Sequence, residues 1–109
     1  MHGIGVDMKL KATYPDAVQV APKTTKVLFE NERIRVLEER FRKGQKVAMH
    51  SHPPHFAYAV TEMKFKLTGP DGKTATVKMK KGDWGSSDEI DTHAVENFVP
   101  GVILVVEIK

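Results

Sequence analysis

The stretch Gly44-Gln45-Lys46-Val47-Ala48-Met49-His50-Ser51-His52 combines a glycine, a strand-like segment and two histidines. Side chains alternate along a β-strand, so His50 and His52 share one side while Val47 lies on the other. Two imidazoles on the same side of a strand can reach one metal ion. A pair of this kind also arises by chance on a solvated face, so two surface histidines remain an alternative at this point.

Strand-like segments recur on both sides of this stretch, and no helical period of useful length is found. The strongest turn signal is Gly69-Pro70-Asp71-Gly72, because Asp-Gly supplies the positive-φ positions of a tight hairpin. An acidic loop is expected from Trp84 to Asp91. The predicted strands are residues 26–30, 33–41, 46–52, 55–61, 64–68, 74–80, 92–99 and 102–108. This pattern predicts an all-β domain, either a sandwich or a barrel.

The composition agrees with one small globular domain. A chain of 109 residues is too short for two cores, and 40% hydrophobic with 28% charged residues is ordinary globular usage. Cysteine is absent, which excludes a disulfide scaffold, a cysteine–zinc site, an iron–sulfur cluster and a thiol nucleophile. Any metal would therefore be bound without thiolate, and the five histidines are the available soft nitrogen ligands.

The charge pattern is that of a mixed surface rather than of a nucleic-acid interface. Lys and Arg number 17 against 14 Asp and Glu, and acidic residues interrupt the densest basic stretch. No segment reaches the roughly 20 apolar residues of a membrane span, and the N-terminus does not have the pattern of a signal peptide. We therefore expect a cytoplasmic protein that binds neither nucleic acid nor membrane.

A second histidine follows a second glycine further along the chain. His93 lies between Gly82 and Asn97, and its strand places His93 and Asn97 on one face. The two stretches resemble the two signature motifs of the cupin superfamily, Gly-xxxxx-His-x-His and a later glycine followed by His-xxx-Asn. The resemblance covers roughly residues 26–109, which are interpreted as the domain. Residues 1–25 are interpreted as an N-terminal extension and lead-in, and His2 within them is not expected to belong to a site.

The resemblance implies a small single-domain cupin-type β-barrel, jelly-roll-like, with a metal held by His50, His52 and His93. Nitrogen ligands suit a divalent transition metal, either iron, zinc, copper or nickel, better than magnesium or calcium. The first motif departs from the family because no acidic ligand follows it, and His55 stands near that position as a possible fourth ligand. Without a carboxylate, the ion would keep its full +2 charge and attract anionic or enolate-like ligands.

The direction in which His55 points is open, because Pro53-Pro54 interrupt the strand and parity cannot be carried across from His52. If His55 points inward, so do two small residues, Ala57 and Ala59, which would leave space beside the metal. Three large residues would then face outward: Phe56, Tyr58 and Val60. The inward arrangement is favoured, because an apolar outer face fits the seam of a homodimer.

Three functions agree with this pattern. The first is a metal-dependent oxidoreductase, dioxygenase-like, acting on a small organic molecule; the second is a non-catalytic cupin that binds a metal or small ligand, such as a sensor. The third is a structural cupin that has lost its metal. Asn97 is interpreted as a residue that fixes a turn or supports a ligand, while Tyr58 and Trp84 are candidates for the pocket, each with ordinary packing as the alternative.

Overall fold

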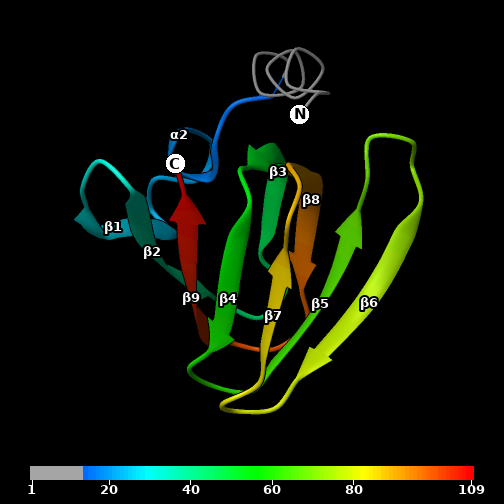
Figure 1. The fold of residues 1–109 in the computed structure, drawn as a ribbon. Helices are drawn as coiled ribbons and strands as arrows, with labels where there is room; N and C mark the ends of the chain where they lie inside the picture. The colour runs from blue at the N-terminus through cyan, green and yellow to red at the C-terminus, as the bar shows by residue number, and fades with distance from the viewer. Residues whose placement is uncertain (1–13) are drawn as a thin grey trace.

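Two antiparallel β-sheets face each other in the structure, a computed structural model that describes residues 14–109 (Figure 1). One sheet has the strand order β1-β2-β9-β4-β7, and the other has the order β3-β8-β5-β6. The strands are β1 (Thr25–Glu30), β2 (Ile34–Phe41), β3 (Lys46–His52), β4 (His55–Ala59), β5 (Met63–Thr68), β6 (Thr74–Met79), β7 (Trp84–Ser87), β8 (Asp91–Asn97) and β9 (Gly101–Ile108). The predicted all-β, jelly-roll-like class is confirmed, although hydrogen bonds do not close the two sheets into one barrel.

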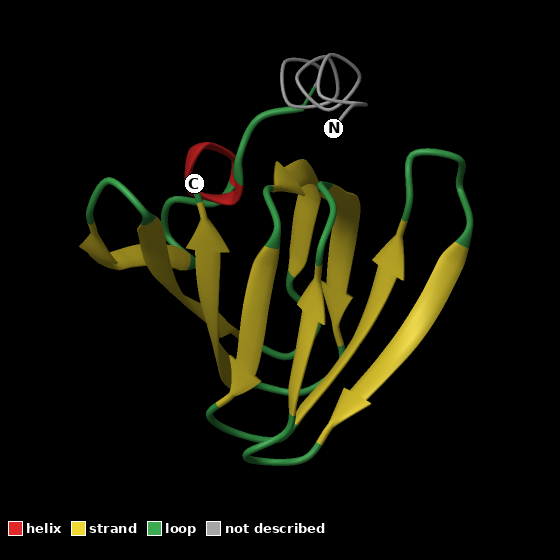
Figure 2. Ribbon diagram, in the orientation of Figure 1, coloured by secondary structure: helices red, strands yellow, loops and turns green. Residues whose placement is uncertain are grey.

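Two short elements differ from the sequence prediction (Figure 2). The prediction of a loop from Trp84 to Asp91 is partly wrong, because the first four of these residues form β7 and pair with β4. Its glycine and serines have low strand propensity, so the pairing with β4 decides the conformation. A helix, α2 (Ala17–Val20), is too short to show a period. Its signal is a capping box, in which the Asp16 carboxylate accepts from the backbone N–H of Gln19 at 3.0 Å.

A β-bulge in β3 decides which side chains of the first motif face the interior. Val47 pairs with Val95, but the next register pair is His50 with His93, so β3 carries one residue more than β8 over this interval. The extra residue shifts the alternation by one position. Val47 and both histidines of the motif are therefore buried, whereas the sequence places them on opposite sides.

The segment before β1 packs on the end of the sandwich that carries the histidines. The backbone N–H of Ser51 donates to the carbonyl of Pro15 at 2.9 Å, and Asp16 forms an isolated parallel bridge with Ser51. The domain boundary at residue 26 stays a prediction, and His2 lies outside the described residues. None of the helices in residues 14–109 is long and apolar enough to cross a membrane. The cytoplasmic location also stays a prediction.

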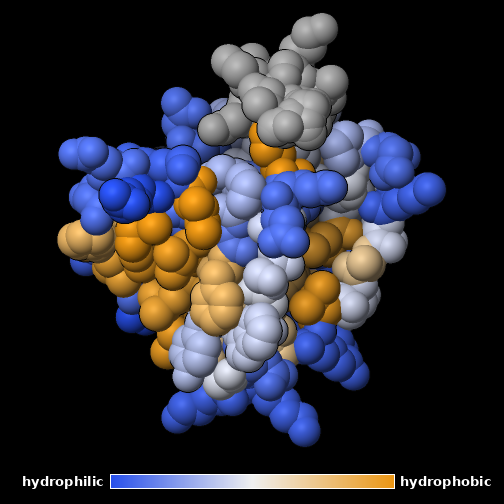
Figure 3. All heavy atoms as spheres, in the orientation of Figure 1, coloured by the Kyte–Doolittle hydropathy of each residue, from blue (hydrophilic) through white to orange (hydrophobic). Residues whose placement is uncertain are grey.

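Strand β9 of the five-stranded sheet carries an apolar row on its outer face. On β9, Ile103, Val105 and Glu107 point inward and are buried, so the alternate residues point outward. These outward residues are Val102, Leu104, Val106 and Ile108. Figure 3 shows a broad hydrophobic patch on this face, over the region where Figure 1 places β9 and β2. This patch is here called the outer apolar face.

Candidate metal centre

Three histidines from the four-stranded sheet gather at one point between the sheets. His50 and His52 come from β3 and His93 from β8, and one ring nitrogen of each lies within 4.8 Å of the others. The ring of His50 lies 4.9 Å, between centroids, from the ring of His52 and from that of His93. The structure thus brings together the three residues that the resemblance implies as ligands.

The hydrogen bonds of these histidines orient the opposite ring nitrogen toward the cluster. Nδ1 of His50 lies 2.7 Å from the carbonyl oxygen of Ala48, and Nδ1 of His52 lies 2.7 Å from Oε2 of Glu107. A carbonyl can only accept, so Nδ1 of His50 donates, which leaves the lone pair on Nε2. Nδ1 of His93 lies 3.2 Å from Oδ2 of Asp91, an ion-pair contact too poorly aligned to count as a hydrogen bond. This arrangement is typical of histidines that bind a metal through Nε2.

His55 points inward and repeats the same arrangement. Its Nδ1 donates to the carbonyl of Pro53 at 2.8 Å, and its ring lies 5.2 Å from the ring of His52. Phe56 and Tyr58 point outward, with 37% and 41% of their surface exposed, as the inward orientation of His55 requires. His55 stands outside the group whose ligand atoms lie within 4.8 Å of one another. It lies at the edge of the cluster, so its role as a fourth ligand stays a prediction.

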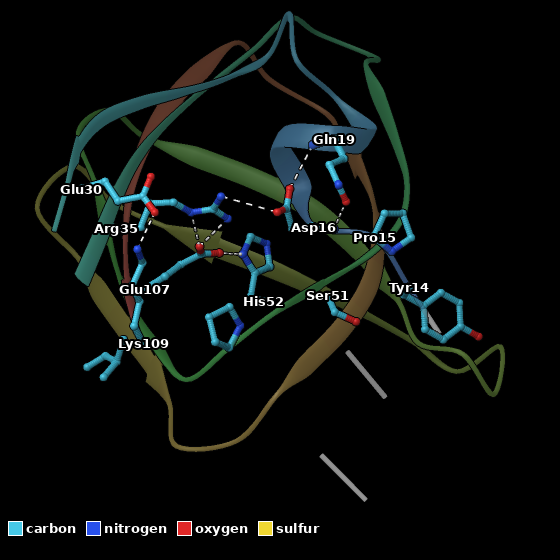
Figure 4. A pocket seen from close by; sticks show the side chains of 12 residues that line it. Tyr14, Pro15, Asp16, Gln19, Glu30, Arg35, Ser51, His52, Glu107 and Lys109 are labelled. Carbon is cyan, nitrogen blue, oxygen red and sulfur yellow. Dashed lines mark hydrogen bonds and ion pairs between the residues drawn. The ribbon is translucent and has the colours of Figure 1, made fainter. Parts of the chain in front are cut away.

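A buried carboxylate, Glu107, joins the cluster to the rest of the fold (Figure 4). Besides its contact with His52, Glu107 accepts from the guanidinium of Arg35, at 2.7 Å from Nη2 and 2.9 Å from Nε. Arg35 also reaches Oδ2 of Asp16 at 3.4 Å, and Asp16 caps helix α2. The carboxylate thus fixes both the position and the tautomer of the His52 ring.

The protonation of the cluster follows from burial and from these partners. Burial disfavours the charged ring and lowers the pKa of His50 to about 4, and it also lowers the pKa of His55. For His52, burial opposes the charge, but the hydrogen bond to Glu107 and the nearby carboxylates outweigh it and raise the pKa. Burial also opposes ionisation of Glu107, yet His52 and Arg35 lower the pKa of this carboxyl. His50 and His55 are therefore neutral at pH 7, as metal ligation requires.

A small cavity of about 120 Å³ adjoins the cluster. It is lined by Glu39, Phe41, His52, His55, Ala57, Phe65, Leu67, Asp91, His93, Val95, Ile103 and Val105. Sequence reasoning missed the carboxylates of Glu39, Asp91 and Glu107 around this site. Their signal is a charged residue at a core-facing position of a strand, such as Glu107 after the inward-facing Ile103 and Val105. The group that could hold an ion contains no carboxylate, as the sequence indicates, but carboxylates lie around it.

The other predicted site residues lie further away. Asn97 is fully buried, and its backbone joins Gly44 and Gln45 through hydrogen bonds of 2.8 and 2.9 Å, which suits the predicted role in fixing a turn. Its side-chain amide has no partner among the described residues. Tyr58 lies on the outer face and does not line the cavity. Trp84 is 64% exposed, stacks on Phe56 and borders a larger groove outside the cavity.

Solved structures with the same fold include several cupins. A cupin domain from Bordetella pertussis Tohama I is 26% identical, with 88% of this chain and 96% of that chain covered and a TM-score of 0.71. A cupin superfamily protein from Desulfitobacterium hafniense DCB-2 is 12% identical, with 77% and 74% covered and a TM-score of 0.60. A variant of oxalate decarboxylase from B. subtilis is 15% identical, and the match covers 78% of this chain but 24% of that chain, with a TM-score of 0.58.

The chain is a cupin by fold, which confirms the superfamily to which its two motifs point. No protein-family model matches the sequence, and no curated protein matches it either. The donor set fits the metal that the superfamily implies, because three imidazoles converge with their Nδ1 atoms directed at oxygens outside the cluster. An ion bound there would be held by His50, His52 and His93.

Replacing Glu107 by Gln is expected to weaken zinc binding by about 10- to 100-fold, because a neutral amide fixes the His52 ring less firmly than a carboxylate. The dissociation constant can be measured by competition with a chromophoric chelator. Glu96→Gln is the matched control, since Glu96 on β8 forms only a surface ion pair with Lys66. Equal zinc affinity in Glu107→Gln and Glu96→Gln would show that the carboxylate does not support the ligand.

The metal-free protein is expected to lose stability in acid because of His50. Its pKa is about 4 when folded and about 6.5 when unfolded, so the unfolded chain takes up the proton first as the pH falls. The part of the free energy of unfolding that depends on His50 is fully present above pH 6.5. It falls by roughly 3 kcal/mol as the pH drops through this window to 4. Urea unfolding of chelator-treated wild type and His50→Gln tests this. Parallel loss of stability in the two proteins would contradict it.

Proposed function

We propose that this protein is a metal-binding cupin in which His50, His52 and His93 hold a divalent transition ion. The observation that carries the proposal is the orientation of the rings. Nδ1 of His50 and of His52 is engaged by an oxygen, and Nδ1 of His93 faces Asp91, so the Nε2 atoms are left for a common ion. Within residues 14–109, no hydrogen bond engages Nε2 of any of the three rings.

The metal-dependent oxidoreductase is the leading enzymatic hypothesis for this site. An ion on three imidazoles keeps open positions and would supply Lewis acidity toward a bound oxygen atom. The chain's own residues supply a largely apolar cavity that limits the size of the ligand and excludes bulk water. The oxalate decarboxylase that shares this fold over 24% of its chain supports catalysis in general terms, since it shows that the fold occurs in an enzyme.

The alternative function is a binding or sensor module. The observation in its favour is the size of the cavity, about 120 Å³, which is small for a substrate together with a co-substrate. Oxygen consumption by the metal-loaded protein over a panel of enolates, diketones, thiols and flavonols distinguishes the two functions. Uptake with one of these compounds supports the oxidoreductase, whereas tight binding without uptake supports the sensor.

We also propose that the protein is a homodimer that buries the outer apolar face. Exposed aromatic and aliphatic residues gather on the five-stranded sheet rather than on its partner sheet. Those with at least a third of their surface exposed are Val27, Leu28, Phe29, Phe56, Tyr58, Trp84 and Ile108. A patch of this extent is uncommon on a monomer and fits the core of an interface between two copies.

Protein purified without an affinity tag is expected to contain one transition ion per chain, which elemental analysis measures. His50→Ala and His93→Ala should each abolish this content, because two nitrogen ligands hold such an ion much more weakly than three. His2→Ala is the control and should keep the metal. A wild-type protein without a stoichiometric ion, whose metal content His52→Ala does not change, would contradict the proposal. This result would favour a structural cupin without metal.

The dimer is expected to have about twice the 12.2 kDa mass of one chain in light scattering at micromolar concentration. Leu104→Glu should dissociate it, because a carboxylate would be placed in the middle of an apolar interface. Lys78→Glu, on the exposed side of β6, is the control and should leave the mass unchanged. A monomeric wild type would contradict the interpretation of the outer apolar face.

A further inference from the structure

Glu39 lies on β2, in the sheet opposite the three clustered histidines, and its side chain points between the sheets. Leu37 and Phe41 share its side of the strand, and both are buried. Its register partner on β9, Ile103, is buried as well. Glu39 lines the small cavity together with His52 and His93, so the exposure that it retains is toward this cavity.

Glu39 differs from the other two carboxylates at the site because no group within the described part of the chain holds it. Glu107 binds His52 and Arg35, and Asp91 contacts His93. Within residues 14–109, no hydrogen bond or ion pair engages the carboxylate of Glu39. A carboxyl kept in a low-dielectric site without a donor is costly unless a ligand supplies one.

The position of Glu39 suits contact with a ligand better than contact with the ion. Among the described residues, the group whose ligand atoms lie within 4.8 Å of one another consists of His50, His52 and His93 and does not include Glu39. Glu39 therefore faces this group from across the cavity. A molecule coordinated to the ion and extending into the cavity would meet the carboxylate at its far end.

The walls of the cavity limit what this molecule can be. Apart from the histidines, Glu39 and Asp91, they are apolar, with Phe41, Phe65, Leu67, Val95, Ile103 and Val105 among them. A larger groove of about 640 Å³ adjoins the cavity, bordered by β4 and β7 on one side and β5 and β6 on the other. His55 and Asp91 are the titratable residues among those that line both spaces. The cavity thus admits a molecule of only a few non-hydrogen atoms.

We propose that Glu39 determines ligand specificity, selecting a small neutral molecule that binds the ion and donates an acidic O–H or N–H to Glu39, and disfavouring small dianions. The inference rests on the proposed metal function and adds the ligand class. A carboxylate accepts a charge-assisted hydrogen bond from such a donor. The same charge repels a second carboxylate, strongly so between apolar walls. The fold shared with oxalate decarboxylase then does not bring oxalate with it as a ligand.

The test uses the zinc-loaded full chain and two probes of similar size, neutral acetohydroxamic acid and dianionic oxalate. Zinc content is measured first in wild type, Glu39→Gln, Glu39→Asp and the control Glu38→Gln. Glu38 is adjacent on β2 but points away from the cavity and pairs with Arg40 at 2.7 Å. Dissociation constants for both probes are then measured by isothermal titration calorimetry, and zinc content is checked again after each titration.

Wild type should bind acetohydroxamic acid at least ten-fold more tightly than oxalate. Glu39→Gln should weaken the binding of the hydroxamic acid by about ten-fold, the loss expected for one hydrogen bond to a charged group. The same substitution should tighten the binding of oxalate. Glu39→Asp, which keeps the charge, should still disfavour oxalate, and Glu38→Gln should behave as wild type.

Two results would overturn the inference, and they are distinguishable. If all four proteins hold zinc but Glu39→Gln leaves both dissociation constants within two-fold of wild type, the role of Glu39 is wrong while the metal site stands. If wild type holds no zinc, the proposed function fails, and the inference fails with it.

Discussion

The site and its surroundings depend on the contact between the buried Glu107 carboxylate and the ring of His52. The carboxylate lies on β9 in one sheet and binds His52 on β3 in the other, where hydrogen bonds between backbones do not join the sheets. Arg35 on β2 balances its charge and extends the contact to Asp16, the cap of α2. This pairing offsets the cost of burying the Glu107 carboxylate. One charged group therefore positions His52, the two sheets and the segment before β1.

The charge around the cluster differs from what the motif spacing alone indicates. The resemblance to the two motifs implies only imidazoles as ligands, which would leave a divalent ion with its whole charge. The structure adds Glu107 behind His52, Asp91 beside His93 and Glu39 across the cavity. These groups surround the ring nitrogens rather than joining the triad, so they reduce the positive field of an ion without occupying its coordination positions.

Local sequence patterns predicted most of the strands and placed His50 and His52 on one face, and the resemblance to the cupin motifs implied that His93 joins them. The local patterns succeeded because alternation and the Asp-Gly turn are properties of neighbouring residues. The partners of the histidines could not be predicted, since Glu39 and Glu107 come from strands distant in sequence and only the strand order brings them together. Strand β7 was missed for the same reason, because its pairing with β4, rather than its propensity, decides its conformation. Helix α2 was missed because four residues are too few to show a helical period.

The bulge in β3 accommodates the length of the first motif. The extra residue between Val47 and His50 lets a core valine and two interior histidines lie on one strand although an odd number of positions separates Val47 from His50. Deleting either intervening residue would leave His50 two positions after Val47, so regular alternation would keep Val47, His50 and His52 on one face without a bulge. Among descendants of this chain, the loss of one codon at this point is therefore compatible with the site.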